Sequence, residues 1–420
     1  MNLSIEQKYK LLFEISHKTS DTLDLDEIMV QLLDTIKSVV DYDAAGIFVL
    51  NQAFSRETGL SSKNLIAGMS FRGYGRLPNG DDMLTHGKGV IGYVITNNTS
   101  LIVSDVRLDE HYVEGRKETL SEIAVPIQVN NQSVGAVNLE SDQLGAYNES
   151  DLSILQFFAD AAAIALEKAI LHRQLLEKEL LDKQLQMAKD VQTHLLPMND
   201  PVIPGYDISG ICIPAEKIGG DYYDYLQLPD GKLGIAVADV SGHGISSALV
   251  MSAFRSQLRT YTHGSESPAQ IACVINERLP EFTGGNHFIT MAYGLLDPKL
   301  DRMIFTRCGH PSPTLIHIDG TSEYLQLNKP AFGIYRKVQY LDETKKLSPG
   351  DILVIFTDGV MDTEDHHGEA FGIKRLMAAV TKNRNLPAKA LINEIINQTR
   401  IFNDFQPFQD DFTLVILKKE

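Results

Sequence analysis

The chain has 420 residues and a formal net charge of −17, and hydrophobic residues make up 43% of it. This length predicts two or more domains, and this composition is typical of a globular chain rather than a disordered one. The acidic balance argues against a protein that binds nucleic acid, because such binding draws mainly on Lys and Arg.

No targeting or membrane segment is expected. Residues 1–7 lack the basic and apolar regions of a signal peptide. The longest apolar run, residues 154–166, is too short to cross a membrane and contains an aspartate. The three cysteines have no metal-binding spacing, and an odd number suits reduced thiols. We therefore expect a cytoplasmic protein with no membrane partner.

Residues 1–168 are predicted to form a mixed α/β domain. Helical patterns cover residues 5–18 and 25–40, and strand-like runs cover residues 46–50, 101–103, 123–129 and 133–139. The polar residues 130–132 predict a hairpin turn between the last two strands.

A long helix follows, with Asp151 as its expected cap, and it continues to Leu196. No Gly or Pro occurs in its second half, and good helix formers dominate there. Apolar residues recur at steps of three, four and seven: Leu166, Ile170, Leu176, Leu180, Met187, Val191 and Leu195. Two interpretations stay open, a rigid spacer packed on its own domains and the seam of a parallel homodimer. Residues 169–200 are therefore assigned to a helical linker, in which prolines end the helix.

Residues 201–420 are predicted to form a second α/β domain that is rich in strands. Strands are expected at 208–213, 233–240, 290–296, 302–306, 314–318, 351–356 and 412–417, and helices at 245–261, 268–279 and 387–402. Because the strands outnumber the helices and follow one another closely, a β-sandwich flanked by helices fits better than a doubly wound parallel sheet.

Carboxylates recur at the ends of these strands. Asp239 and Asp358 each end an apolar strand, Asp221 follows two glycines, and Asp410 opens the last strand. One such aspartate is most simply a helix cap. Four of them invite a common explanation, because clustered carboxylates raise each other's pKa unless a cation neutralises them. Oxygen ligands of this kind suit Mg²⁺ or Mn²⁺, and two such ions would clamp a phosphoryl group.

The order of these motifs resembles the bacterial sporulation and stress-response branch of the PPM, or type 2C, Ser/Thr phosphatases. They are Gly-Gly-Asp221, Asp239-Val-Ser-Gly-His-Gly, Thr-Asp358-Gly and Asp410-Asp-Phe-Thr. The resemblance implies an α-β-β-α sandwich with two Mn²⁺ or Mg²⁺ ions. It implies that Asp239 bridges both ions, with the Val240 carbonyl as a further ligand, and that Asp358 and Asp410 complete one ion. Asp221 would serve the site directly or through water, so Asp221 and Asp239 are the expected catalytic pair.

Asp410 and Asp411 adjoin on an extended segment, so their side chains are expected to point to opposite sides. The family pattern favours Asp410 as the residue that faces the ions, and it implies that Asp411 tolerates replacement by Asn. Whether Asp224 contributes to the site is left open.

The resemblance also implies an activity and a partner. The expected reaction is removal of phosphate from Ser or Thr of a protein by attack of metal-activated water, without a phosphoenzyme. The expected substrate is an antagonist of an anti-sigma factor. The alternative is a non-catalytic sensor or scaffold that uses the same fold to bind partners. A two-metal nuclease would need basic surface that the charge balance does not supply.

The histidines near these motifs are interpreted as structural. His243 is expected to support its turn, because the eukaryotic relatives carry their catalytic histidine at the place that Ser241 occupies here. Ser241 is expected to cap the following helix. His310 is expected to pack in a turn, and His366 and His367 to lie in a solvated loop.

The N-terminal domain resembles a GAF sensor domain. The resemblance rests on Gly-Lys-Gly-Val-Ile-Gly at 87–92, Ile-Val-Ser-Asp-Val at 102–106 and the segments 121–127 and 135–141. No cysteine precedes Cys212, which excludes a thioether-linked bilin, and the pattern of cyclic-nucleotide-binding members is absent. His111 is expected to be an ordinary loop residue rather than a haem ligand. The GAF ligand therefore stays unknown.

Overall fold

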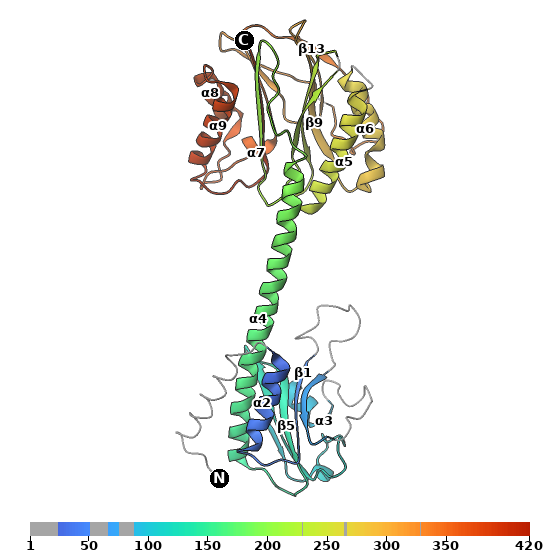
Figure 1. The fold of residues 1–420 in the computed structure, drawn as a ribbon, viewed down its shortest axis with the longest axis vertical. Coiled ribbons are helices and arrows are strands. Elements are labelled where there is room, and N and C mark those ends of the chain that lie inside the picture. The colour runs from blue at the N-terminus through green and yellow to red at the C-terminus, as the bar shows by residue number, and fades with distance from the viewer. Residues whose placement is uncertain (1–23, 51–65, 75–87, 229, 264–266, 328) are drawn as a thin grey trace. The chain divides into compact units, whose positions relative to one another are not determined.

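The computed structural model describes residues 24–50, 66–74, 88–228, 230–263, 267–327 and 329–420 (Figure 1). The chain divides into two compact units, Met1–Leu180 and Leu181–Glu420, and each is described by itself below. The helix expected at 5–18 lies outside the described residues. No helix in the described ranges combines the length and the apolarity needed to cross a membrane.

The N-terminal unit is built on one antiparallel sheet, in which the described strands have the order β2-β1-β5-β4-β3. The strands are β1 Ala44–Leu50, β2 Ile66–Arg72, β3 Leu101–Val103, β4 Ser121–Val129 and β5 Gln132–Ser141. The helices are α2 Leu25–Lys37, α3 Gly89–Asn97, the 3-10 turn η3 Val106–Leu108 and α4 Glu149–Thr193. All the strands expected in this unit are present, whereas β2 and α3 were not predicted.

The two faces of this sheet carry separate apolar layers. On one face α2 and the first turns of α4 bury residues such as Leu33 and Phe158 against the strands. On the other face α3 buries Val90 and Val94 against Phe48. The sheet is thus a central layer between helices, which confirms the mixed α/β prediction.

A local signal explains the hairpin turn that was expected between β4 and β5. Asn130 and Asn131 have φ angles of 51° and 62°, the left-handed backbone that a tight hairpin needs, and β4 pairs with β5 as predicted.

Asp151 does not cap α4 in the expected way. The Asn148 side chain accepts a hydrogen bond from Ser150 N at 2.8 Å, and Asp151 Oδ2 accepts one from Asn148 N at 3.0 Å. The pair forms a capping box that begins three residues earlier.

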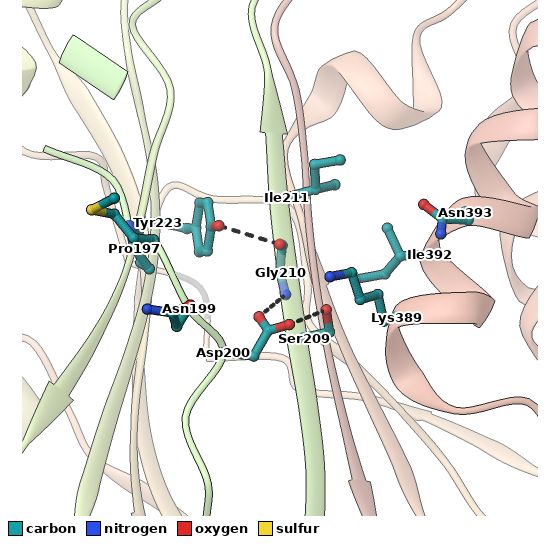
Figure 2. Close-up of a pocket in the computed structure, with 11 residues that line it drawn as sticks. Pro197, Asn199, Asp200, Ser209, Gly210, Ile211, Tyr223, Lys389, Ile392 and Asn393 are labelled. Atoms are coloured by element: carbon teal, nitrogen blue, oxygen red, sulfur yellow. Dashed lines mark hydrogen bonds between the residues drawn. The ribbon is translucent and has the colours of Figure 1, made fainter. Parts of the chain in front are cut away.

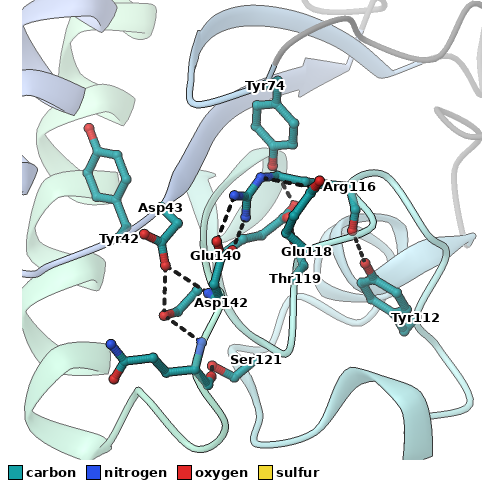
Figure 3. A network of polar contacts seen from close by, with 12 residues as sticks. Tyr42, Asp43, Tyr74, Tyr112, Arg116, Glu118, Thr119, Ser121, Glu140 and Asp142 are labelled. Atoms are coloured by element: carbon teal, nitrogen blue, oxygen red, sulfur yellow. Dashed lines mark hydrogen bonds and ion pairs between the residues drawn. The ribbon is translucent and has the colours of Figure 1, made fainter.

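A buried polar network lies on the α3 side of this sheet, around Glu140 (Figure 3). Glu122 and Glu140 face each other across β4 and β5, and both are buried. Tyr74 donates a hydrogen bond of 2.5 Å to Glu140, and Asn138 donates one of 2.9 Å to Glu122. Burial, followed by the charge of Glu140, raises the pKa of Glu122 to about 8. The nearby Arg116 pairs with Asp142 instead.

The C-terminal unit is a sandwich of two antiparallel sheets. Among the described residues their orders are β13-β10-β9-β8-β7 and β12-β11-β14-β15-β6. The first sheet contains β7 Tyr222–Gln227, β8 Leu233–Val240, β9 Ile289–Asp297, β10 Arg302–Cys308 and β13 Glu343–Lys346. The second contains β6 Tyr206–Ile213, β11 Thr314–Ile316, β12 Ser322–Tyr324, β14 Ile352–Phe356 and β15 Phe412–Lys419.

Helices cover the outer face of each sheet (Figure 1). The helices α5 Ile245–Thr262 and α6 Pro268–Thr283 pack on the first sheet, with Phe254 at the centre of that layer. The helices α8 Gly372–Lys382 and α9 Ala388–Phe402 pack on the second, and the short α7 Asp358–Met361 lies at its edge. Residues such as Val237 and Val415 fill the space between the sheets. The predicted α-β-β-α sandwich is confirmed.

The second half of α4 carries an apolar stripe that the described residues leave uncovered. Its exposed members are between 51% and 65% exposed: Leu176, Leu180, Met187 and Val191. Leu171, Leu175 and Leu181 are exposed as well, but at about 100° per residue they lie on other faces of the helix. Just beyond the helix, Leu195 and Leu196 pack against the core of the C-terminal unit. Both interpretations of this helix, a rigid spacer packed on its own domains and the seam of a homodimer, therefore stay open.

Candidate metal centre

The four predicted motifs meet at one end of the sandwich. Asp221 precedes β7 and Asp239 lies near the end of the adjacent, antiparallel β8. Asp358 follows β14, and Asp410 and Asp411 precede the antiparallel β15. Each sheet therefore contributes two loops to the same end.

Asp221 connects the two sheets. It is 3% exposed, and its Oδ2 accepts hydrogen bonds from Thr357 Oγ1 at 2.8 Å and Thr413 Oγ1 at 2.5 Å, both on the second sheet. Burial first, and then the charges of Asp239 and Asp411, raise the pKa of Asp221 well above its usual range. Sequence reasoning found Asp221 but not the two threonines that hold it.

The glycines of the motifs allow these loops to approach. A Cβ on Gly219 would lie 2.1 Å from Asp411 Oδ2, and a Cβ on Gly359 would lie 2.1 Å from the Asp411 carbonyl oxygen. On Gly220 it would lie 2.7 Å from the Val240 carbonyl oxygen. Any side chain at these positions would push the loops apart, so the small residues are required by the contact between loops.

Asp410 and Asp411 do point to different surroundings. The Asp411 carboxylate accepts hydrogen bonds from Ala215 N at 2.9 Å, Gly220 N at 2.7 Å and Asp221 N at 3.2 Å. It therefore fixes the backbone of the Asp221 loop. Asp410 is exposed, and its pKa is raised by partial burial and by Asp358 and Asp411. The Asp410 carboxylate accepts one backbone hydrogen bond, from Asp411 N, so of the two it has more capacity left to bind an ion.

Repulsion among the carboxylates shows that they face a common region. Burial, then Asp358, Asp410 and Asp411, raise the pKa of Asp239 to about 7. Burial also raises the pKa of Asp358. Across the described part of the chain, no Lys or Arg forms an ion pair with any of the five aspartates.

The same carboxylates do not form a closed coordination shell. Within the described ranges, no group of three or more His, Cys, Asp and Glu side chains is close enough together to hold a metal ion. The mutual repulsion of the carboxylates and their open arrangement agree if the carboxylates surround an open space. One buried and several partly exposed carboxylates, which offer only oxygen donors and have no Lys or Arg partner in the described ranges, match the preference of Mg²⁺ and Mn²⁺. The residues present thus fit such ions.

Asp224 does not belong to this group. Its carboxylate receives two hydrogen bonds from Arg259, at 2.7 and 2.8 Å, and one of 2.5 Å from the Tyr222 hydroxyl. A carboxylate already paired in this way stabilises the contact between β7 and α5 and is not available as a ligand.

The turn after Asp239 is held by a histidine that the sequence did not indicate. His287 Nδ1 lies 2.9 Å from the Ser241 carbonyl oxygen, and its Nε2 lies 2.9 Å from Ser246 Oγ. Ser241 exchanges hydrogen bonds of 3.0 Å with Phe288. The expected capping by Ser241 is therefore wrong, and Gly244 occupies the N-cap of α5. No sequence signal links residues so far apart.

Of the other histidines, His310 and His366 lie in the surroundings that were expected, whereas no hydrogen bond of the described structure ties His243 to its turn. His243 is exposed, and its Nδ1 lies 3.1 Å from Glu216. His366 is exposed and pairs with Asp404 at 3.0 Å, whereas His310 is buried. His111, in the N-terminal unit, pairs with Asp109 and stacks on Tyr93.

A separate cavity of about 200 Å³ lies between the segment that follows α4, strand β6 and helix α9 (Figure 2). Asp200 in its wall accepts hydrogen bonds from Ser209 Oγ and Gly210 N. The cavity contains none of the motif carboxylates, so it is not the candidate metal centre.

Comparison with protein families decides what these domains are. Residues 229–420 match the model of the stage II sporulation protein E (SpoIIE) family, and residues 22–167 match that of the GAF domain. The C-terminal unit is a SpoIIE-type phosphatase domain, and the N-terminal unit is a GAF domain. Both resemblances drawn from the motifs are thereby confirmed.

Three curated relatives match a large part of the chain. Protein IcfG of Synechocystis is 28% identical over 261 residues, covering 55% of this chain and 41% of the relative. Phosphoserine phosphatase RsbU of Bacillus subtilis is 28% identical over 240 residues, covering 56% of this chain and 70% of RsbU. Phosphoserine phosphatase RsbP of the same species is 25% identical, covering 43% of this chain and 45% of RsbP. The matching region thus spans less than half of IcfG and RsbP.

A solved structure supports the fold of the SpoIIE-type domain. The SiaA-PP2C domain of Pseudomonas aeruginosa superposes with a TM-score of 0.52 at 21% identity, covering 58% of this chain and 99% of that domain. The α-β-β-α sandwich is therefore the fold of a PP2C domain.

Proposed function

We propose that this protein is a metal-dependent protein Ser/Thr phosphatase regulated by its GAF domain. The observation that carries the proposal is the set of five aspartates that two sheets bring to one region, where no Lys or Arg of the described ranges pairs with them. A non-catalytic scaffold would have no need to keep so much uncompensated charge together. The names of RsbU and RsbP as phosphoserine phosphatases support the same reaction.

The proposal gives each residue a role. Asp239, Asp358 and Asp410, with the Val240 carbonyl and Asp221 directly or through water, would hold two Mn²⁺ or Mg²⁺ ions. When bound, such ions activate water and neutralise the phosphoryl oxygens. Thr357 and Thr413 orient the Asp221 carboxylate, and Asp411 orients its backbone. His287 keeps the Gly-rich turn beside Asp239 in place.

The proposed substrate is a cytoplasmic protein phosphorylated on Ser or Thr, of the anti-sigma-factor antagonist kind. This finer assignment rests on the family resemblance and on the names of RsbU and RsbP as phosphoserine phosphatases. It agrees with the chain's acidic character, because a protein with a formal charge of −17 is poorly suited to polyanions such as nucleic acid.

The test is hydrolysis of p-nitrophenyl phosphate and of a phosphoserine peptide by the full chain. We expect phosphate release with Mn²⁺ that stops when EDTA removes the metal and returns when Mn²⁺ is restored. Activity that persists in EDTA would contradict the metal centre. No activity on either substrate at any Mn²⁺ or Mg²⁺ concentration would favour the scaffold alternative.

Regulation is proposed to pass through α4 in a homodimer. The support is the exposed stripe on α4, which a second copy of the helix would cover. The same helix ends at the candidate metal centre, because Gln192 exchanges hydrogen bonds with the backbone of Gly219 at 2.7 and 3.2 Å. A change in the pairing of two helices would therefore reach the Gly-Gly-Asp221 loop.

This leads to a prediction about α4. Leu176→Asp combined with Leu180→Asp is expected to convert a dimer into a monomer, as measured by sedimentation equilibrium at micromolar concentration. Lys178→Asp, on the opposite face, is the matched control and should stay dimeric. Inserting one residue after Glu179 rotates all that follows by about 100°, so phosphatase activity should change. A monomeric parent protein, or insertions of one, two and three residues without effect, would refute this coupling.

A further inference from the structure

His310 is a buried imidazole directly beneath the candidate metal centre, and the proposed reaction gives it no role. It is 1% exposed and lies in a sharp Gly-His-Pro turn after β10. Gly309 has a φ of 66°, and a Cβ there would lie 2.7 Å from Ala331. Arg307 donates a hydrogen bond of 2.7 Å to the His310 carbonyl. The turn is therefore fixed on both sides of the ring.

One ring nitrogen is hydrogen-bonded to β9, the strand that pairs with the strand of Asp239. His310 Nδ1 lies 2.7 Å from Thr290 Oγ1. Thr290 is the residue of β9 that stands directly opposite Asp239 of β8 in the sheet. The ring thus contacts the first sheet at the position where the bridging carboxylate is expected.

The ring also lies close to the second sheet. Burial first, and then Arg307, lower the pKa of His310 to about 3, while the backbone of Phe356 acts in the opposite direction. A backbone group that favours the protonated ring lies close to it, so the ring is near the backbone of Phe356, at the end of β14. Nε2 nevertheless completes no hydrogen bond in the described structure. A buried N–H group without a hydrogen-bond partner lowers the free energy of unfolding.

Phe356 ends β14 and is followed by two residues of the site. Thr357 holds Asp221, and Asp358 is an expected metal ligand. The imidazole therefore lies between Thr290, whose strand pairs with that of Asp239, and the strand end that precedes Asp358. This position gives a polar side chain a use at a place where an apolar one would pack without an unsatisfied group.

We propose that His310 is a positioning residue that couples the two halves of the metal centre. Its Nδ1 accepts a hydrogen bond from Thr290, and its Nε2–H is poised to donate to the Phe356 carbonyl when metal ions draw Asp239 and Asp358 together. The inference rests on the proposed function, because it assumes that these aspartates bind metal. The ring acts in its neutral form and changes no protonation state.

The first test is Mn²⁺ affinity, measured by isothermal titration calorimetry on the full chain without substrate. His310→Leu is expected to weaken Mn²⁺ binding by about 10-fold or more, which is typical for groups that orient metal ligands. His310→Gln keeps an N–H donor and should bind within about 3-fold of the parent. Thr290→Val should weaken binding in the same direction as His310→Leu.

His317→Leu is the matched control. This histidine is half-buried and pairs with Asp351 at 3.1 Å, at the start of β14 rather than its end. We expect it to lower thermal stability without changing Mn²⁺ affinity. If His310→Leu fails to fold, His310→Gln and Thr290→Val decide the question by the same measurement.

A second test uses NMR of protein labelled with ¹⁵N-histidine. On addition of Mg²⁺, the Nε2–H resonance of His310 should move to lower field and exchange more slowly, as a hydrogen bond forms. Unchanged Mn²⁺ affinity in His310→Leu together with an unmoved resonance would reduce His310 to a packing role. A parent protein that binds no Mn²⁺ would instead overturn the proposed function, and this inference with it.

Discussion

Replacing Asp239 by Asn is expected to lower phosphatase activity by about 1,000-fold or more, equivalent to roughly 4 kcal/mol of transition-state stabilisation. Asp239 is surrounded by Asp358, Asp410 and Asp411, and its pKa of about 7 reflects burial and their charges. The amide has nearly the same size, so the fold should be kept. It removes one of the negative charges that would bind both ions, so Mn²⁺ affinity should fall as well.

The stability of this variant gives an internal control. Without metal, Asp239→Asn removes repulsion, so its urea midpoint should equal or exceed that of the parent. Asp319→Asn changes an aspartate of an exposed turn in the same domain and should leave activity unaltered. Activity of Asp239→Asn near the parent level would show that Asp239 does not bind the ions.

The adjoining residues Asp410 and Asp411 should respond differently to the same change. Asp410→Asn is expected to abolish activity with little effect on stability, because its carboxylate bonds only to the neighbouring Asp411 N, at 2.8 Å. Asp411→Asn is expected to lower both the phosphatase activity and the stability of the fold. Its carboxylate uses two oxygens to accept three backbone N–H groups, and an amide offers only one oxygen. Leaving buried donors unpaired should cost about 1–3 kcal/mol.

Urea unfolding and p-nitrophenyl phosphate hydrolysis, measured on both variants, separate these roles. The family pattern alone implied that Asp411 tolerates Asn, and the hydrogen bonds to the Asp221 loop now argue against that. An Asp411→Asn protein with parental stability and activity would return the assignment to the family pattern. Parental activity in Asp410→Asn would mean that Asp410 does not bind metal.

Two of the strands that position the site, β8 and β14, were predictable because they are almost entirely apolar, whereas β7, which follows Asp221, was not predicted. The pattern for β8 gave its bounds, and that for β14 was right to one residue, since both strands are buried on both faces. In contrast, β13 consists of Glu-Thr-Lys-Lys on a sheet edge and has no apolar signal to detect. The amphipathic α8 was also missed, although it packs in the core of its layer.

The residues that carry charge at the site were found from local motifs, but their supports were not. Thr357 and Thr413 contact Asp221 across 136 and 192 residues of chain. A hydroxyl beside a strand has many ordinary uses, so neither threonine stands out until the two sheets are brought together. The same holds for His287, which reaches Ser241 from 46 residues away.

The buried glutamate pair of the GAF domain makes its folding depend on protons. Glu122 has a pKa of about 8 in the folded domain, through burial and the charges of Glu140 and Asp109, against an ordinary value of 4.5. Between these values the folded domain keeps a proton that the unfolded chain releases. This contribution to stability is therefore complete below pH 4.5 and is lost as the pH rises through 8. The loss begins at pH 4.5, so by neutral pH most of this contribution is already gone, and an event that ionises the remaining protonated Glu122 would destabilise the folded domain.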